Sequence, residues 1–542
     1  MKKIIVSILF MLAAVPCMMS AADVADYNVV PLPSSIQNVK GEAFVVNANT
    51  RVVYPAGNAD LQRDAEFLAE YIHEATNIKV SVDTKVSKNC IRLAIDSKIQ
   101  GEEAYQLSVD KKGIVIAGST GKGVFYGVQT LRKSLPIGKM EAVELPAVKI
   151  ADAPRFGYRG MMLDCSRHFF SIGFVKKFIN MLALHNMNVM HWHLTDDQGW
   201  RIEIKKYPRL TTIGSKRSGT VVGHNSMADD SLEYGGFYTQ EEAREIVRYA
   251  AERYITVIPE IDMPGHMKAA LAAYPELGCT GGPYEVGHRW GIYTDVLCLG
   301  NEKVYDFCQD VLAELMDIFP SNYIHIGGDE TPTTRWQACA KCQAVAKEHG
   351  LNAKNMQGYF TNRIEKFVNS RQHSIIGWDE ILEGDINESA TIMSWRGTQN
   401  GEKASEKGHD VIMSPTTYCY FDFQQTDKEV KYEPSLCNNC ITVEKLYGFE
   451  PCPDNLSEAA KKHMLGVQAN VWTEYITCPS TLEYYIMPRM AALAEVQWVN
   501  GAKDFEAFKT RLTRLTNTYE LYHWNYAKHL WPERMVSPWI EN

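Results

Sequence analysis

The stretch Tyr323-Ile-His-Ile-Gly-Gly-Asp-Glu330 places a short apolar run directly before two glycines and two acidic residues. Such a run is typical of a buried strand, and the polar residues then lie at its carboxyl end. Seven similar runs occur before and after it, each followed by a stretch with helical periodicity. The eight runs lie at residues 160–163, 188–193, 255–261, 323–326, 374–377, 390–393, 410–413 and 466–471. Eight strand-then-helix units predict an α/β fold, a (β/α)8 TIM barrel.

The barrel accounts for only part of the 542 residues. Residues 24–150 combine short β-like runs with one helical face and contain no tryptophan, which predicts a small α+β domain. We therefore expect four segments. They are a signal peptide at 1–22, the α+β domain at 23–150, the catalytic barrel at 151–505, and a helical, aromatic-rich extension at 506–542 that packs on the barrel.

The N-terminus has the pattern of an export signal. Lys2 and Lys3 precede an apolar run at residues 4–15, and Ser20-Ala-Ala22 offers small residues for cleavage. Cys17 suggests a lipoprotein, but Val15-Pro16 before it is a poor acceptor context, so we favour simple cleavage. No later stretch approaches the ~18 consecutive apolar residues of a membrane span. We therefore expect a periplasmic or extracellular protein without a transmembrane segment.

The charge of the chain bears on nucleic-acid binding, and its cysteine spacing bears on disulfides and zinc. The net charge is −9 and no polybasic run is present, so we expect no nucleic-acid binding. Export permits disulfides. Two Cys-x-x-Cys pairs occur, Cys339/Cys342 and Cys437/Cys440. About 95 residues separate the pairs, far more than in a compact zinc ribbon, so we expect local disulfides or free thiols on loops.

Polar and aromatic residues gather where the predicted strands end. In barrels of this kind the active site lies at the carboxyl ends of the strands. Packing alone does not require such residues at eight strand ends, so their convergence predicts an enzyme. The clusters are Asp164/Arg167/His168, Thr195-Asp196-Asp197, Asp262/His266, Asp329-Glu330, Trp378-Asp379-Glu380, Trp395-Arg396, Tyr420/Asp422 and Trp472/Glu474.

The acidic pair Asp329-Glu330 is the central candidate for catalysis. The glycines before it let the backbone turn sharply and let a ligand approach closely. At a strand-to-loop transition both carboxylates can reach one pocket, and burial with like charge raises the pKa of one so that it can serve as a general acid. The competing interpretation is a helix cap before Thr331-Pro332.

Two histidines support an alternative function. On a strand His191 and His193 share one face, as in a metal-dependent amidohydrolase or deacetylase. Asp196, Asp197 or Asp262 would complete that metal site. The same segment also fits a hydrogen-bonded strand end without metal, which we favour. A third possibility is a non-catalytic sugar-binding protein of the same fold, against which the complete acidic motif argues.

These motifs together resemble the β-N-acetylhexosaminidases of glycoside hydrolase family 20. The resemblance implies an exo-acting enzyme that removes terminal non-reducing N-acetyl-D-hexosamine from glycans or chitooligosaccharides with β-linked GlcNAc or GalNAc. It implies a retaining mechanism in which the substrate's acetamido oxygen is the nucleophile, and no metal or organic cofactor. The segments that carry it are Tyr158-Arg-Gly-Met-Met-Leu-Asp-Cys-Ser-Arg-His-Phe169, His191-Trp-His-Leu-Thr-Asp-Asp-Gln-Gly-Trp-Arg201, Pro259-Glu-Ile-Asp-Met-Pro-Gly-His266, His325-Ile-Gly-Gly-Asp-Glu330, Gly377-Trp-Asp-Glu380, Ser394-Trp-Arg-Gly397 and Val471-Trp-Thr-Glu474.

The resemblance also implies the catalytic roles. Glu330 protonates the leaving oxygen and then activates water, while Asp329 orients the acetamido N–H and stabilises the developing positive charge. Tyr420 donates to the acetamido carbonyl. Asp196 and His266 form a hydrogen-bonded relay that supports Glu330.

The remaining roles concern sugar binding. The expected substrate-binding residues are Arg159 and Glu474 on the 3- and 4-hydroxyls, Asp422 on the 4- or 6-hydroxyl, and Trp378, Trp395 and Trp472 as walls of the pocket. Family members often supply a further tryptophan from the loop after the seventh strand. Residues 424–451 contain none, so the fourth wall is unassigned.

Overall fold

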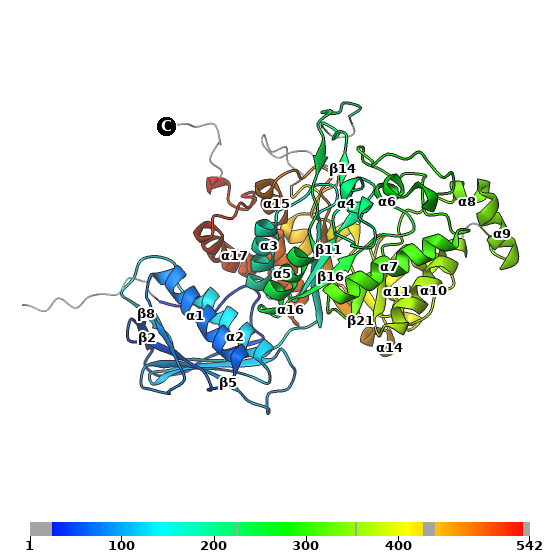
Figure 1. Ribbon diagram of the computed structural model, residues 1–542. Coiled ribbons are helices and arrows are strands. Elements are labelled where there is room, and N and C mark those ends of the chain that lie inside the picture. Colours follow the sequence, from blue (N-terminus) through cyan, green and yellow to red (C-terminus); the bar gives the residue numbers. More distant parts are fainter. Residues whose placement is uncertain (1–23, 224–225, 353–354, 427–438, 535–542) are drawn as a thin grey trace, which may run out of the picture.

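The computed structural model describes residues 24–223, 226–352, 355–426 and 439–534. The expected signal peptide at 1–22 and the end of the C-terminal extension lie outside these ranges. The chain forms a sheet with two helices and, beside it, a barrel surrounded by helices (Figure 1). Within the described residues, no helix combines the length and apolar character that crossing a membrane requires.

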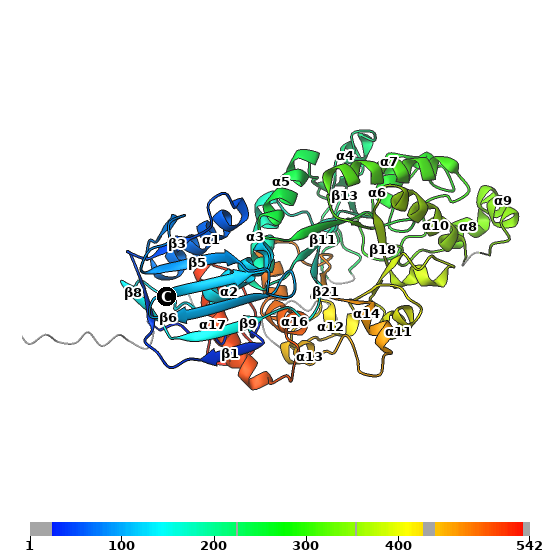
Figure 2. The ribbon, with the colours of Figure 1, turned by 90° about the horizontal axis from the view of Figure 1, so that it is seen from below.

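The N-terminal part is the expected α+β domain. Its helices α1 (Ala59–Thr76) and α2 (Gly121–Ser134) cover one face of the sheet (Figures 1 and 2). β2 (Phe44–Asn47) and β8 (Ala142–Leu145) pair separately. The seven strands of the sheet are, in spatial order, β1 (Ser35–Asn38), β9 (Val148–Asp152), β6 (Tyr105–Asp110), β7 (Gly113–Gly118), β5 (Cys90–Ile95), β3 (Arg51–Val53) and β4 (Ser81–Asp83).

The second part is a closed eight-stranded parallel barrel, which confirms the fold prediction. Each strand overlaps one of the eight apolar runs, and β21 pairs with β10 to close the ring. The strands are β10 (Tyr158–Asp164), β11 (Val189–His193), β16 (Thr256–Glu260), β17 (Tyr323–His325), β18 (Ser374–Trp378), β19 (Thr391–Ser394), β20 (Val411–Met413) and β21 (Met464–Val471).

Helices follow the barrel strands and cover them from outside (Figure 1). The helices that cover the strands are α3 (Ile172–Leu184), α5 (Gln240–Ala251), α7 (Glu302–Ile318), α10 (Asn355–Ser370), α11 (Gln399–Glu406), α15 (Pro479–Ile486) and α16 (Arg489–Trp498). Further elements lie in the connections. They are β12 (Thr195–Asp196), β13 (Gly199–Trp200), α4 (Arg209–Thr212), β14 (Lys216–Arg217), β15 (Tyr234–Gly235), α6 (Lys268–Ala273), α8 (Thr334–Ala338), α9 (Ala340–Glu348), α12 (Thr416–Cys419), α13 (Val443–Tyr447) and α14 (Glu458–Lys462).

Capping and periodicity explain why these helices form where they do. In α1, Asn58 caps the first turn by accepting from the Leu61 N–H, and Asn77 ends the helix at φ 63°. Its buried residues recur at helical spacing and face the sheet. α5 begins with a capping box, in which the Thr239 hydroxyl and the Glu242 carboxylate each accept from the other's backbone N–H.

The two parts of the chain are packed against each other through α2 and the C-terminal helix α17 (Phe505–Leu521). The ring of Tyr126 on α2 lies 4.9 Å from that of Trp498 on α16. Arg132 donates to the Tyr522 hydroxyl at 2.7 Å. The described part of the extension therefore contacts both the barrel and the N-terminal domain. β9 also crosses residue 150, the expected domain boundary, so the sheet continues to Asp152.

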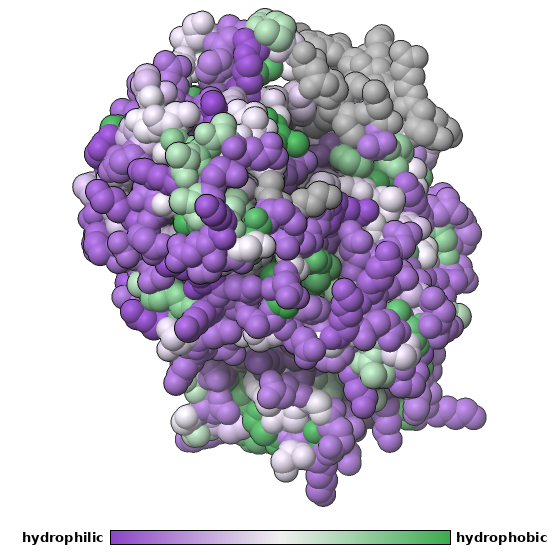
Figure 3. Space-filling model, turned by 90° about the vertical axis from the view of Figure 1, so that its right-hand side faces the viewer, coloured by the Kyte–Doolittle hydropathy of each residue, from purple (hydrophilic) through white to green (hydrophobic). Residues whose placement is uncertain are grey.

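Apolar side chains are largely enclosed by these layers. The fully buried ones include the large rings of Trp192, Trp200 and Trp336, inside the barrel's helical shell. The face of the molecule drawn in Figure 3 is mostly hydrophilic, with small and separated hydrophobic patches. The polar groups that are buried are therefore the informative ones, and many lie at one end of the barrel.

Candidate active site

Because parallel strands are in register, their carboxyl ends meet at one end of the barrel. Asp164 at the end of β10 pairs with His193 at the end of β11, and Glu260 at the end of β16 pairs with His325 of β17. A cavity of about 420 Å³ opens above these ends. Its lining residues are Arg167, His266, Trp290, Gly291, Asp329, Glu330, Trp395, Thr416, Tyr420, Asp422, Phe423, Trp472, Glu474, Tyr475 and Ile476.

The two glycines after β17 shape the turn that leads to the acidic pair. Gly327 and Gly328 have φ of 66° and 96°, which side chains rarely tolerate. A Cβ on Gly327 would lie 1.8 Å from Asp262 Oδ1, and the Gly328 N–H donates to the same oxygen at 3.0 Å. The two glycines therefore make room for the Asp262 side chain, whereas the sequence analysis expected them to make room for a ligand.

Asp329 lines the cavity, and its side chain is 13% exposed. Its Oδ1 atom is buried, and its Oδ2 atom lies 3.9 Å from His266 Nε2. Burial raises the pKa of Asp329, while the charge of His266 and a hydrogen bond from Asp262 act in the opposite direction. The pKa of Asp262 lies well above its usual range because that carboxyl is buried and faces Asp329. Asp262 therefore carries the proton of this pair and donates to Asp329.

His266 connects Asp196 with the acidic pair. Its Nδ1 lies 3.1 Å from Asp196 Oδ1, and its Nε2 lies 3.7 Å from Glu330 Oε2 and 3.9 Å from Asp329 Oδ2. Burial lowers the pKa of His266, but the Asp196 charge and hydrogen bonds to Asp196, Asp197 and Glu330 together outweigh burial and raise that pKa well above the usual value. The expected chain of Asp196, His266 and Glu330 is thus present in space. His266 is an imidazolium held between carboxylates.

Two residues of the Asp196–His266–Glu330 relay have strained backbones. His266 and Glu330 have φ of 50° and 44°, in the left-handed region that residues other than glycine seldom adopt. Such conformations persist where the surrounding structure enforces them, and they concentrate at functional sites. Here they direct both side chains towards the same cavity.

Arg159 does not lie in this cavity, and its predicted role in binding the sugar is wrong. It is the second residue of β10 and therefore lies at the amino end of the strand, opposite the active-site end. Its guanidinium is buried and donates to Glu103 at 2.6 Å and to the Tyr126 hydroxyl at 2.8 Å. Arg159 instead connects the barrel to the N-terminal domain.

Arg167 occupies the position that the sequence analysis gave to Arg159. It follows the carboxyl end of β10 and lines the cavity. Its guanidinium lies 2.8 Å from Asp196, 3.2 Å from Asp164 and 3.7 Å from Glu474, and stacks 4.9 Å from the Trp472 ring. Arg167 lies three residues after Asp164, the last residue of β10, and this position after the strand end is the sequence signal for an active-site residue.

The aromatic walls differ partly from the expectation. Trp395 and Trp472 line the cavity, and the Trp395 ring stacks on Tyr420 at 6.2 Å. Trp378 is only 1% exposed and lies 5.9 Å from the Trp472 ring, so it supports the wall from behind. Asp422 lines the cavity, and its Oδ1 is buried without a partner among the described residues.

Trp290 supplies the wall that the sequence analysis left unassigned. It lies in the loop between α6 and α7, which follows the third barrel strand rather than the seventh. Its ring lies 5.7 Å from His168 and 6.3 Å from Tyr475, and it lines the cavity. Its Nε1 donor is buried without a partner among the described residues. The long loop was visible in the sequence, but its direction across the barrel was not.

The histidines of the alternative function belong to a buried network. Glu260 lies within 3.0 Å of Nε2 of His191 and of Nδ1 of His325, and it also contacts His193. His193 Nε2 contacts Asp196 at 3.0 Å. These groups lie beneath the cavity, inside the barrel, and the charge of Glu260 is shared among three imidazoles. They are arranged to hold the strand ends and Asp196 in place.

A (β/α)8 barrel whose strand ends combine a partly exposed acidic pair with aromatic walls defines a glycosidase. Two family models match, "Glycosyl hydrolase family 20, catalytic domain" at residues 156–501 and "Glycosyl hydrolase family 20, domain 2" at residues 26–153. The chain belongs to glycoside hydrolase family 20. Its activity is that of a β-N-acetylhexosaminidase, and the metal-dependent alternative is not favoured.

Similar proteins agree with this assignment. A Porphyromonas gingivalis β-hexosaminidase is 41% identical over 92% of this chain, and the chain spans 64% of that relative's length. A Vibrio furnissii β-hexosaminidase is 37% identical, with 88% of this chain and 77% of the relative covered. The Streptomyces coelicolor GH20 β-N-acetylhexosaminidase has a TM-score of 0.80 at 30% identity, covering 96% and 99% of the two chains. A Vibrio harveyi GH20 exo β-N-acetylglucosaminidase, solved with N-acetylglucosamine, has a TM-score of 0.83 at 31% identity, covering 95% and 80%.

Proposed function

We propose that this enzyme uses the substrate's own acetamido group as its nucleophile while it removes terminal N-acetylhexosamine. The carboxylate of Asp329, partly exposed in the cavity beside Glu330, carries this proposal. An ionised carboxylate only accepts hydrogen bonds, so a ligand in the cavity must approach it with a donor. The acetamido N–H is such a donor. Its binding there would turn the acetamido oxygen towards the anomeric carbon.

The acid–base steps then fall to Glu330. It lines the cavity beside Asp329, and its side chain is 36% exposed, so both the leaving oxygen and water can reach it. It donates a proton to the leaving oxygen as the acetamido oxygen attacks, and it later takes a proton from the water that opens the oxazolinium ring. Two displacements at the same carbon retain the β configuration. Tyr420 donates to the acetamido oxygen and so orients it.

The sugar hydroxyls are assigned to the polar side of the cavity. Arg167 and Glu474 lie together there and can hold the 3- and 4-hydroxyls, and Asp422 can accept from the 4- or 6-hydroxyl. Trp395, Trp472 and Trp290 provide faces against which the apolar side of the sugar packs. The substrates are glycans ending in β-linked GlcNAc or GalNAc, and the N-terminal signal pattern supports action outside the cytoplasm.

Arg167→Ala is expected to lower kcat/KM, because it removes a charge-assisted donor to the sugar and leaves Asp196 and Glu474 facing each other without their cation. We expect a loss of about 10²-fold, corresponding to about 3 kcal/mol for a hydrogen-bonded charge. The substrate is an aryl N-acetyl-β-glucosaminide. Arg159→Lys is the matched control, since it keeps a cation beside Glu103, away from the cavity. A larger loss for the control than for Arg167→Ala would return the sugar-binding role to Arg159.

The function is tested with an aryl N-acetyl-β-glucosaminide in the presence and absence of a chelator. We expect the aryl group to be released at the same rate during a brief exposure to EDTA, because Asp329, Glu330 and the acetamido group supply the chemistry. Loss of turnover restored by zinc would support the hydrolytic metal centre at His191 and His193. Binding without turnover would support a non-catalytic sugar-binding protein.

A further inference from the structure

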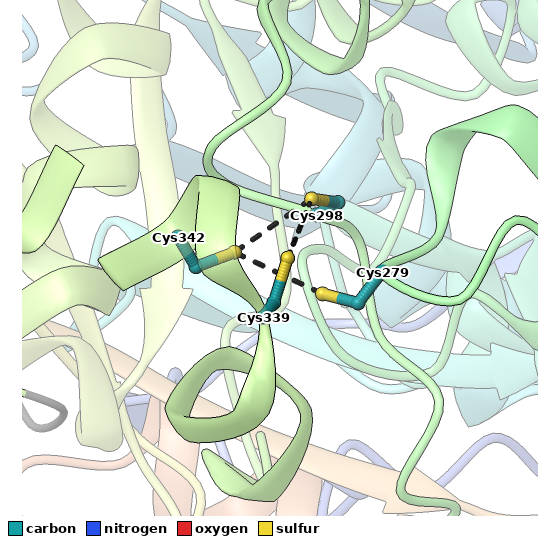
Figure 4. A group of neighbouring side chains, drawn as sticks. All are labelled: Cys279, Cys298, Cys339 and Cys342. Carbon is teal, nitrogen blue, oxygen red and sulfur yellow. Dashed lines mark hydrogen bonds between the residues drawn. The ribbon is translucent and has the colours of Figure 1, made fainter. Parts of the chain in front are cut away.

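Four cysteines from three separate segments bring their sulfur atoms together (Figure 4). Cys279 Sγ lies 3.8 Å from Cys342 Sγ, and Cys298 Sγ lies 3.7 Å from the sulfurs of both Cys339 and Cys342. All four sulfurs lie within 4.8 Å of one another. Cys298 and Cys342 are buried, and the other two are partly buried. None of the four cysteines lines the active-site cavity, and the cluster takes no part in the chemistry described above.

The spacing of these sulfurs fits four ligands around one ion. Zinc–thiolate bonds are about 2.3 Å long, so tetrahedral geometry places neighbouring sulfurs about 3.8 Å apart. A disulfide would instead bring one sulfur to about 2.05 Å from a single partner. Here Cys298 and Cys342 each lie almost equally far from two sulfurs. This even spacing favours a shared central ligand over two separate pairs.

The backbone around the cluster is also adapted to it. Cys339 and Cys342 flank the start of α9 with the two-residue spacing usual in zinc sites. A Cβ on Gly300 would lie 2.2 Å from the carbonyl carbon of Lys341 and 2.5 Å from the Cys342 nitrogen. Only glycine lets the segment carrying Cys298 approach the first turn of α9 this closely.

We propose that Cys279, Cys298, Cys339 and Cys342 bind a structural Zn²⁺ ion. Four thiolates fill the coordination sphere, so the ion has no open position for water or substrate and stabilises structure only. Binding transfers the thiol protons to solvent. This arrangement differs from the expected local disulfides or free thiols, because Cys339 and Cys342 would share one ion with two loop cysteines. Of the second pair considered in the sequence, Cys437 lies outside the described residues and Cys440 is not a member of this cluster.

The ion would fix two loops that shape the active site. One runs from Cys279 to Cys298 and carries Trp290 to the cavity. The other leads from Glu330 into α8 and α9. Two contacts already join them beside the cluster, from Arg335 Nε to Asp295 at 2.7 Å and from Trp336 Nε1 to the Leu297 carbonyl at 2.8 Å. The site therefore ties a wall of the pocket to the segment that follows its acid–base residue.

Metal analysis of the purified full-length chain tests the proposal without reference to activity. We expect about one zinc per chain by elemental mass spectrometry, with all four thiols alkylated after denaturation in chelator. Cys342→Ser should lose the zinc, whereas Cys478→Ser, an exposed cysteine outside the cluster, should retain it. Two disulfides by intact mass, iron in place of zinc, or unchanged zinc in Cys342→Ser would each overturn the proposal.

A ligand replacement separates loss of metal from loss of folding. Cys342→His keeps a zinc-binding side chain and is expected to restore zinc to more than half of the wild-type content. Cobalt exchanged into the wild-type chain should give the thiolate-to-cobalt and tetrahedral ligand-field absorption bands, and Cys478→Ser should give the same spectrum. A folded Cys342→His chain without zinc, or an octahedral cobalt spectrum, would contradict four-cysteine coordination.

Discussion

Glu330→Gln is expected to reduce kcat/KM by about 10²–10⁴-fold on substrates with poor leaving groups. The amide keeps the shape of the carboxyl but cannot protonate the leaving oxygen. A nitrophenolate needs little protonation, so a nitrophenyl substrate should recover much of the rate of the first step. The measurement is kcat/KM across aryl N-acetyl-β-glucosaminides of graded leaving-group pKa. For Glu330→Gln, kcat/KM should fall steeply as the leaving-group pKa rises, whereas for the unaltered enzyme it should fall only slightly.

The control for this variant is Glu383→Gln. Glu383 is an exposed carboxylate that pairs with Arg396 at 2.7 Å, outside the cavity lining. The dependence of kcat/KM on leaving-group pKa for Glu383→Gln should match that of the unaltered enzyme. If Glu330→Gln lost activity equally with all leaving groups, its role as general acid would be wrong.

Asp329→Asn is expected to cost about 3–4 kcal/mol of transition-state stabilisation, or roughly 10²–10³-fold in kcat/KM. The asparagine removes the charge that steadies the oxazolinium-like transition state. It also offers an N–H where the acetamido group needs an acceptor. Because the acetamido attack is impaired whatever the leaving group, the loss should be similar across the series of aryl substrates.

The position of Asp262 sharpens this expectation. Its proton and the Gly328 N–H hold the Asp262–Asp329 pair in one geometry, so Asp329→Asn disturbs a pair rather than a free side chain. Circular dichroism should show the variant folded. If the leaving-group slopes of Asp329→Asn and Glu330→Gln were exchanged, the two roles would be exchanged with them.

The barrel and the acidic pair were predictable because they depend on local patterns. Apolar runs ending in polar residues identify the strands, and the glycines before Asp329 mark a turn at a strand end. The same rule should have excluded Arg159, which begins its strand, and selected Arg167, which follows it. That error came from matching a motif without counting positions along β10.

Features that depend on folded loops were not predictable. Trp290 reaches the cavity from a loop after the third strand, and nothing in its neighbours in sequence indicates this path. Cys279 and Cys298 meet Cys342 only because the same loop returns to α9. Sequence spacing identified only the Cys339/Cys342 pair of this cluster, and its partners are long-range contacts. The protonated state of Asp262 likewise follows from burial against Asp329.

The central claim is that the substrate's acetamido oxygen is the nucleophile. Its most direct test compares kcat/KM for an aryl N-acetyl-β-glucosaminide and the matching aryl β-glucoside, which differ only at carbon 2. The glucoside lacks the nucleophile and the N–H that would pair with the Asp329 carboxylate, so we expect it to be almost inert, at least about 10³-fold slower. Efficient cleavage of the glucoside would require a nucleophile from the protein and would contradict the account.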